Sequence, residues 1–200
     1  MMRLLLLLSV AVCAQQVLDV PALAHVLDGD GRLTAVYGLA GNFVPGVPGE
    51  TLLAYANDGE YEWRLAAGEV TVTHEGQTAR RATEATRAEF RGAYAVLGEE
   101  RETLRLEGGE LVAAEEAPAA LSLAGRTILW AEGQLRVTQA DGSEEPVDCP
   151  LEPEGMTAAG AEWARLTLAG RPYLLRVTPG RVGLYLLPKR AAVPVDRRRP

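Results

Sequence analysis

Leu121-Ser-Leu-Ala-Gly-Arg-Thr-Ile-Leu-Trp130 and Leu166-Thr-Leu-Ala-Gly-Arg-Pro-Tyr-Leu-Leu175 are two copies of one pattern, 45 residues apart and identical at six of ten positions. Each copy places a glycine between two short apolar runs, which is typical of a β-hairpin. A weaker pair aligns Arg64-Leu65-Ala-Ala-Gly68-Glu69-Val70 with Arg105-Leu106-Glu-Gly-Gly109-Glu110-Leu111, 41 residues later. The repetition predicts that the paired segments occupy equivalent places in successive structural units.

Short apolar, β-branched runs extend this pattern along the chain. They cover residues 33–37, 51–55, 70–73, 93–97, 103–106, 127–130, 134–138, 173–177 and 182–187. Turn dipeptides such as Asp30-Gly31, Ala67-Gly68 and Asp141-Gly142 separate them and supply the positive-φ positions of tight turns. Residues 78–90 alone have a helical composition. Because their apolar positions are small alanines with no broad apolar stripe, we expect a linker or irregular strand there.

These features predict an all-β fold, an antiparallel β-repeat with about four to five blade-like units, propeller-like in architecture. A period of about 40 residues suits a blade, since one small sheet cannot bury both faces and must stack on its neighbours. A β-sandwich and an open β arc are the alternatives. Residues 17–25 are a candidate for closing a ring.

The composition excludes several classes of protein. In 200 residues, 48% are hydrophobic and 24% charged, so the chain is neither wholly disordered nor collagen-like nor a polytopic membrane protein. The formal net charge of -7 argues against a nucleic-acid partner for the folded body.

The N-terminus has the order of a secretory signal peptide. Arg3 precedes an apolar run, and the small residue Ala14 comes just before the polar Gln15-Gln16. We expect cleavage after Ala14, export to the periplasm or beyond the cell, and no transmembrane segment in the remaining chain. The domain boundaries predicted are a signal peptide at 1–14, a β-repeat domain at 15–188 and a basic disordered tail at 189–200.

The order of motifs resembles a group of uncharacterised exported β-propeller-like repeat proteins of soil bacteria. The resemblance rests on Leu27-Asp28 through Val44, on Val147-Asp148-Cys149-Pro150, on Trp163-Ala-Arg-Leu-Thr167 and on residues 182–188. It implies a propeller-like fold and brings no known activity.

Nucleophiles and metal ligands are sparse in this sequence. Cys149 has neither His25 nor His74 near it in sequence, and we expect a half-buried thiol. Ser122 falls at a strand position and Ser143 in a turn, and neither lies in a nucleophile elbow. The two histidines lack ligand spacing.

Other motifs also have plain structural interpretations. Asp28-Gly-Asp-Gly31 has the composition of an ordinary turn. Gly38-Leu-Ala-Gly41 lacks the lysine of a phosphate-binding loop, since the chain's one lysine is Lys189.

Carboxylates and aromatic rings are the remaining candidates. The pairs Glu99-Glu100, Glu115-Glu116 and Glu144-Glu145 fall in polar segments, where we expect solvated side chains. Trp63, Trp130 and Trp163 fall in or beside expected strands with Tyr55, Tyr61, Tyr94 and Tyr173. Because Trp130 aligns with Leu175, we expect it in the core.

We therefore predict a non-enzymatic exported module that acts as an interaction or scaffold protein. We expect no catalytic, cofactor-binding or metal-ligating residue and no cofactor. The expected partner is a protein or a glycan, not nucleic acid, and the expected state is a monomer. The alternatives are an exported glycosidase-like hydrolase that uses a carboxylate pair, and a truncated copy of a longer propeller protein.

Overall fold

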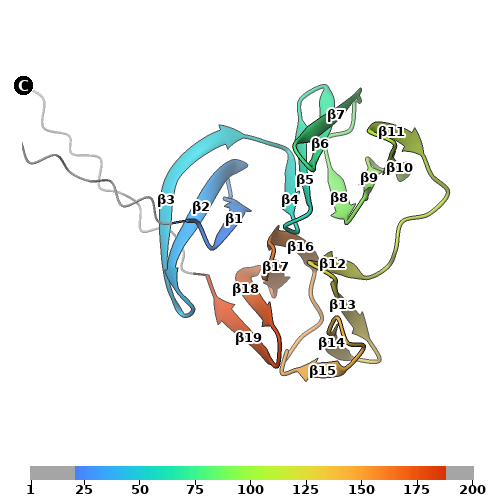
Figure 1. Cartoon of the computed structure of the whole chain (residues 1–200). Helices are drawn as coiled ribbons and strands as arrows, with labels where there is room; N and C mark the ends of the chain where they lie inside the picture. The colour runs from blue at the N-terminus through green and yellow to red at the C-terminus, as the bar shows by residue number, and fades with distance from the viewer. Residues whose placement is uncertain (1–20, 188–200) are drawn as a thin grey trace, which may run out of the picture.

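The computed structural model describes residues 21–187, which form β-strands joined by turns and short loops (Figure 1). The expected all-β class with antiparallel sheets is confirmed. Within these residues there is no helix that is long and apolar enough to cross a membrane. The predicted signal peptide and basic tail lie outside the described range.

The strands fall into five groups, each a run of consecutive antiparallel neighbours. Group 1 holds β1 (Ala24–Leu27), β2 (Arg32–Leu39) and β3 (Asn42–Thr51). Group 2 holds β4 (Ala54–Asn57), β5 (Tyr61–Ala66), β6 (Glu69–His74) and β7 (Gln77–Ala82). Group 3 holds β8 (Ala88–Arg91), β9 (Tyr94–Leu97), β10 (Glu102–Glu107) and β11 (Glu110–Ala113). Group 4 holds β12 (Leu121–Leu123), β13 (Arg126–Ala131), β14 (Gln134–Thr138) and β15 (Glu144–Val147). Group 5 holds β16 (Gly155–Gly160), β17 (Trp163–Leu168), β18 (Arg171–Thr178) and β19 (Arg181–Leu186).

Groups 2 and 5 are joined into one eight-stranded sheet. The junction is a parallel pairing of β4 with β16, at Asn57 and Ala159. The remaining groups each form a sheet of their own, with three strands in group 1 and four in groups 3 and 4. Two groups far apart in the sequence therefore share backbone hydrogen bonding at the middle of the molecule.

Alternating side chains explain the strands of group 2. Trp63 and Leu65 on β5, and Val70 and Val72 on β6, are fully or almost fully buried, while their sequence neighbours are half-buried. Such alternation is the pattern of a strand with one face on the core. Gly68, with φ +88°, closes the hairpin between the two strands.

The two Leu-x-Leu-Ala-Gly-Arg segments are hairpins with the same turn but different places in their groups. Ala124 and Gly125 both have positive φ, as do Ala169 and Gly170, which is what a two-residue type I′ turn requires. The first segment joins the first and second strands of group 4, whereas the second joins the second and third strands of group 5. The expectation of equivalent positions is therefore wrong.

The weaker repeat is displaced in the same way. Its copies join β5 to β6, the second and third strands of group 2, and β10 to β11, the third and fourth strands of group 3. What repeats within this chain is thus a hairpin of fixed geometry. The repeated hairpin does not occupy a fixed position within the four-stranded groups. The sequence of a hairpin specifies its turn and the alternation of side chains along its two strands. It does not specify which further strand pairs with the hairpin.

Residues 78–90 hold most of β7 and β8, joined by a short connection at 83–87, so the strand alternative describes this segment better than the linker. β7 pairs with β6 over its whole length, and β8 pairs with β9. Ala79 and Phe90 reach the core from these strands, and Ala85 and Ala88 pack against it. The charged residues Arg80, Glu84, Arg87 and Glu89 are exposed.

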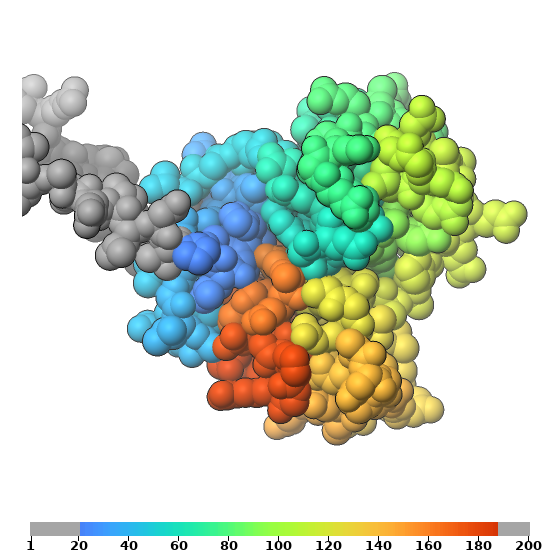
Figure 2. Space-filling model, viewed as in Figure 1, coloured from blue at the N-terminus to red at the C-terminus, as the bar shows by residue number. Residues whose placement is uncertain are grey.

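One main core joins groups 2 to 5, and a second cluster joins group 1 to group 5. The main core includes Leu65, Leu104, Ile128 and Leu166, all inaccessible to solvent. In the second cluster, Phe43 of β3 packs edge-on against Trp163 and Tyr185, with ring centroids 5.8 and 6.0 Å away. The first and last groups of the described chain therefore pack together, as Figures 1 and 2 show.

The first strands of all five groups meet at the middle of the molecule. β1 contacts β4 and β16, β4 contacts β8, and β16 contacts both β8 and β12. Figure 1 shows the later strands of each group lying progressively farther outward. Small residues permit the close approach of these strands, since Ala158 and Ala159 on β16 are almost fully buried.

Candidate functional site

A cavity of about 480 Å³, here named the central cavity, lies where the first strands of groups 1, 2, 3 and 5 converge. Its wall is built from residues 25–27, 53–55, 88–91 and 153–159, together with Arg165. These segments belong to β1, β4, β8 and β16 or directly precede them, with Arg165 on β17. The volume falls within the range of small-molecule sites, about 300–1,000 Å³.

Arg165 is the most unusual charged residue of this wall. It lies opposite Thr157 on β16 and Leu174 on β18. Its side chain also lines a second cavity of about 270 Å³ between groups 1 and 5. Its Nε atom is buried and has no hydrogen-bond partner, and within residues 21–187 no ion pair reaches its guanidinium group. Burial lowers the pKa of Arg165, because desolvation disfavours the charged form.

Arg176 provides a comparison in the same sheet. Its Nε is also buried without a hydrogen bond, but its Nη2 lies 3.2 Å from the Glu162 carboxylate. Its guanidinium group also lies over the ring of Trp163, 5.5 Å from the centroid. Arg176 therefore has a counter-ion and an aromatic partner in the folded chain.

The carboxylates of the central cavity are already engaged. Glu154 accepts a hydrogen bond from the amide of Gly170, with N–O distances of 3.0 and 3.2 Å to its two oxygens. Glu89 lies 3.3 Å from Arg91 and 3.6 Å from Arg101. Neither contact involves Arg165, so its charge stays uncompensated by these neighbours.

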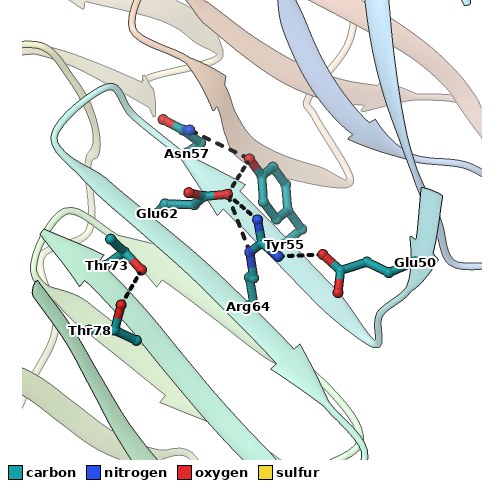
Figure 3. A network of polar contacts seen from close by, with 7 residues as sticks. All are labelled: Glu50, Tyr55, Asn57, Glu62, Arg64, Thr73 and Thr78. Carbon is teal, nitrogen blue, oxygen red and sulfur yellow. Dashed lines mark hydrogen bonds and ion pairs between the residues drawn. The ribbon is translucent and has the colours of Figure 1, made fainter. Parts of the chain in front are cut away.

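Tyr55 and His25 form an aromatic part of the wall. Their rings meet edge to face with centroids 6.3 Å apart. The Tyr55 hydroxyl donates to Glu62 Oε1 at 3.2 Å and accepts from the side-chain amide of Asn57 at 3.5 Å (Figure 3). Burial raises the pKa of Tyr55 to about 12, so its phenol stays protonated at neutral pH.

The same network holds a second arginine on the neighbouring strand. Arg64 lies between Glu62, whose Oε1 is 2.7 Å from Nη2, and Glu50 (Figure 3). Two acidic groups flank this cation, which fixes the end of β3 against β4 and β5. Arg64 and Arg165 are the same residue type, and they differ in that Arg64 has two acidic partners whereas Arg165 has none among the described residues.

The candidate nucleophiles lie away from the central cavity. Cys149 follows β15 and is half-buried, as expected. Its thiol lies 3.2 Å from the carbonyl oxygen of Leu151, and burial raises its pKa. Ser143 donates from its hydroxyl to Asp141 within a turn, at 2.6 Å. Ser122 lies in β12, in the strand position predicted for it.

The two histidines occupy unrelated places. His25 lines the central cavity, whereas His74 stacks on Tyr61 with centroids 4.4 Å apart. Among the residues that the structure describes, no group of three or more His, Cys, Asp or Glu side chains is arranged to hold a metal ion.

The glycine-rich candidates are ordinary turns. Asp28 Oδ1 accepts hydrogen bonds from the amides of Asp30 and Arg32, at 2.9 and 3.0 Å. The segment from Gly38 to Gly41 is the turn between β2 and β3. Lys189 lies outside the described residues.

The glutamate pairs lie in connections or at a strand end. Five of their side chains are exposed and Glu145 is half-buried; the exposed ones are Glu99, Glu100, Glu115, Glu116 and Glu144. Glu115 and Glu116 line an outer hollow of about 550 Å³ together with Trp130.

The tryptophans are divided between core and surface. Trp63 and Trp163 are buried, whereas Trp130 is only half-buried beside this hollow. Trp130 packs against the main core from its edge, so the expectation that it belongs to the core is met only in part. Its aligned counterpart Leu175 is fully buried on the third strand of its group, while Trp130 lies on the second strand of a different one.

Comparison with models of known protein families gives no match, and comparison with curated protein sequences gives none. Arg165 did not stand out among the candidate residues of the sequence. The signal that could have found it is a cation between Trp163 and Leu166, within a strand whose apolar residues occupy both faces. On such a strand neither face is open to water, so a charged side chain there is expected to be at least partly buried.

Proposed function

We propose that this protein is an exported, non-enzymatic binding module. In this proposal the five strand groups act as the blades of a small propeller-like ring, and a ligand enters where their first strands meet. The observation that carries the proposal is the central cavity itself, whose wall combines apolar and aromatic side chains with a similar share of polar surface. Pockets at the convergence of several elements are the usual places for ligands.

The chemistry of the cavity wall supports binding over catalysis. A nucleophilic mechanism requires a hydroxyl or thiol within reach of a base. Cys149, Ser122 and Ser143 do not line the cavity. Thr157 does line it, but among the described residues no hydrogen bond joins its hydroxyl to His25 or to a carboxylate of the wall. Its two carboxylates, Glu89 and Glu154, are held by other groups. Tyr55 keeps its proton. We therefore propose that the partner is a glycan or a protein segment small enough for one end to enter this space.

A blocking substitution tests the location of binding. Gly155 lines the cavity, and a β-carbon there would meet no atom within 4 Å. Gly155→Phe should therefore fold normally and abolish binding to an immobilised panel of glycans and peptides. Ala113→Phe, at the exposed end of β11, is the matched control and should bind as the wild type does.

Two further measurements test export and the lack of catalysis. N-terminal sequencing of the exported protein should find Gln15 as the first residue. Incubation with glycoside, ester and phosphoester substrates should give no turnover. Turnover that disappears on replacing one glutamate of a pair would instead establish the hydrolase alternative.

A further inference from the structure

We infer that Arg165 binds an oxyanion, a carboxylate or phosphate group, of a small ligand in the central cavity. The inference rests on the proposed binding function and adds the chemical class of the ligand.

The first step is the exceptional status of Arg165 among the arginines of residues 21–187. Every other arginine that is not exposed has a hydrogen bond or ion pair from its side chain: Arg64, Arg81, Arg91, Arg105, Arg126, Arg136 and Arg176. Arg165 has neither, although the residue is half-buried between two cavities and its Nε is inaccessible to solvent. A buried donor without a partner is unfavourable, so its retention calls for a compensating group.

The second step concerns the shape of the missing partner. A guanidinium group presents donors in a planar fork that matches the two oxygens of a carboxylate or phosphate. The unsatisfied donor is Nε, which belongs to one edge of that fork. An oxyanion that accepts from Nε and a neighbouring Nη would satisfy the buried donor and neutralise the charge together.

The third step excludes the acidic residues of the wall as that partner. Glu154 accepts from Gly170, and Glu89 lies beside Arg91 and Arg101. Arg91 lines the cavity but donates to the carbonyl of Pro118, 3.2 Å away, and pairs with Glu89. In the second cavity, Asp28 and Asp30 lie in the same wall as Arg165, but neither forms an ion pair with it.

Among the arginines that line these two cavities, Arg165 is therefore the one without a protein partner within residues 21–187.

The remaining wall limits the size and character of the ligand. The space of about 480 Å³ admits a small molecule or the end of a chain, and His25 and Tyr55 offer aromatic surface on one side. An acidic sugar at the end of a glycan and a small phosphorylated compound share the required chemistry.

Calorimetric titration of the full exported chain distinguishes these sources. The probes are acetate, inorganic phosphate and trigalacturonate, with neutral galactotriose as the control at equal ionic strength. We expect saturable binding of at least one anion and an affinity at least tenfold lower in Arg165→Gln. Arg165→Lys, which keeps the charge but not the fork, should lose part of the affinity. Arg176→Gln should bind as the wild type does.

Thermal unfolding provides a readout that a purely structural role would not produce. Without ligand, Arg165→Gln should unfold at the same temperature as the wild type or higher, because it removes an uncompensated charge. With the bound anion, the wild type alone should gain stability. This gain in the wild type tests the inference even if a variant fails to fold.

Three results would overturn the inference. They are no saturable anion binding by the wild type, equal anion affinity in Arg165→Gln, or a lower unfolding temperature of unliganded Arg165→Gln. If galactotriose binds, and Gly155→Phe but not Arg165→Gln abolishes its binding, the oxyanion assignment fails while the proposed function stands. Turnover of a substrate would count against the proposed function itself.

Discussion

The indole Nε1 of Trp63 donates a hydrogen bond to the carbonyl oxygen of Gly92 at 2.7 Å. This bond ties β5 of group 2 to the turn between β8 and β9 of group 3. The Trp63 ring also stacks on Phe90, with centroids 5.3 Å apart and planes 12° from parallel. One side chain thus supplies both a polar and an apolar contact between two neighbouring groups, which Arg81 and Glu102 also join by an ion pair.

Replacing Trp63 by Phe should lower the free energy of unfolding by about 1–3 kcal/mol, since a buried hydrogen bond is lost. Urea denaturation at equilibrium measures the effect. Trp130→Phe is the control, and because Trp130 is half-buried its cost should stay below about 1 kcal/mol. Equal losses in the two variants would contradict the assigned role of the Trp63 bond.

Close packing between two turns makes Gly59 intolerant of a methyl group. A β-carbon at Gly59 would lie 2.5 Å from Cβ of Ala161, and its φ is +92°. Gly59→Ala should therefore cost about 1–3 kcal/mol for overpacking, in addition to about 1–2 kcal/mol for the backbone conformation.

Gly68→Ala isolates the backbone part of that cost. Gly68 has a similar φ of +88°, and a β-carbon there would meet no atom within 4 Å. Its loss of stability in thermal or urea unfolding should be the smaller of the two. Adding Ala161→Gly to Gly59→Ala should recover part of the loss, and a purely additive double variant would refute the proposed clash.

Phe43 should be the main apolar link between groups 1 and 5. Phe43→Ala removes both aromatic contacts of a buried ring and should cost about 3–5 kcal/mol. Val47 on the same strand is 89% exposed, so Val47→Ala should change stability by less than about 0.5 kcal/mol. Urea denaturation of both variants checks this, and similar midpoints would show that the two groups do not depend on Phe43.

Asp58 and Asp141 should give opposite pH dependences. Burial raises the pKa of Asp58 above its ordinary value of 3.8, so its contribution to stability is present below that pH. The contribution is lost as the pH rises through the folded-state pKa. Asp58→Asn keeps an acceptor for the amides of Glu60 and Tyr61. It should therefore be more stable than the wild type at neutral pH, and the difference should shrink in acid.

Hydrogen bonds from Ser143 lower the pKa of Asp141 instead. Its contribution is present above the ordinary value and is lost as the pH falls through the lower, folded-state pKa. Asp141→Asn should therefore be less stable than the wild type at neutral pH, and the gap should close in acid. Thermal unfolding across the acid range measures both variants. If both were less stable than the wild type at neutral pH, or both more stable, the result would contradict the opposite pKa shifts of Asp58 and Asp141.

The strands and turns were predictable because they depend on neighbours in the chain. The expected strand over 134–138 is β14 with identical bounds, and Gly31, Gly68 and Gly142 all adopt positive φ in the expected turns. Strands with small or charged residues were not recognised. The clearest cases are β16, with the sequence Gly-Met-Thr-Ala-Ala-Gly, and β7, because close approach and pairing stabilise them more than apolar alternation does.

The grouping of strands and the cavity were harder to predict because they depend on distant contacts. The same kinds of turn residue close hairpins within a group and connect one group to the next. The sequence around a turn therefore does not show where one group ends and the next begins. Arg165 illustrates the same limit. Its sequence neighbours identify a strand, but only the convergence of β1, β4, β8 and β16 shows that its guanidinium group lacks a partner.

The contact of Phe43 with Trp163 spans 120 residues of sequence. Contacts between residues so far apart in sequence slow folding, because the entropy of closing a long loop is lost before the contact stabilises the chain. A nascent chain that ends before β17 has no indole to cover the Phe43 ring. Its aromatic cluster can therefore assemble only after β17 has been synthesised, so group 1 lacks this part of its core until then.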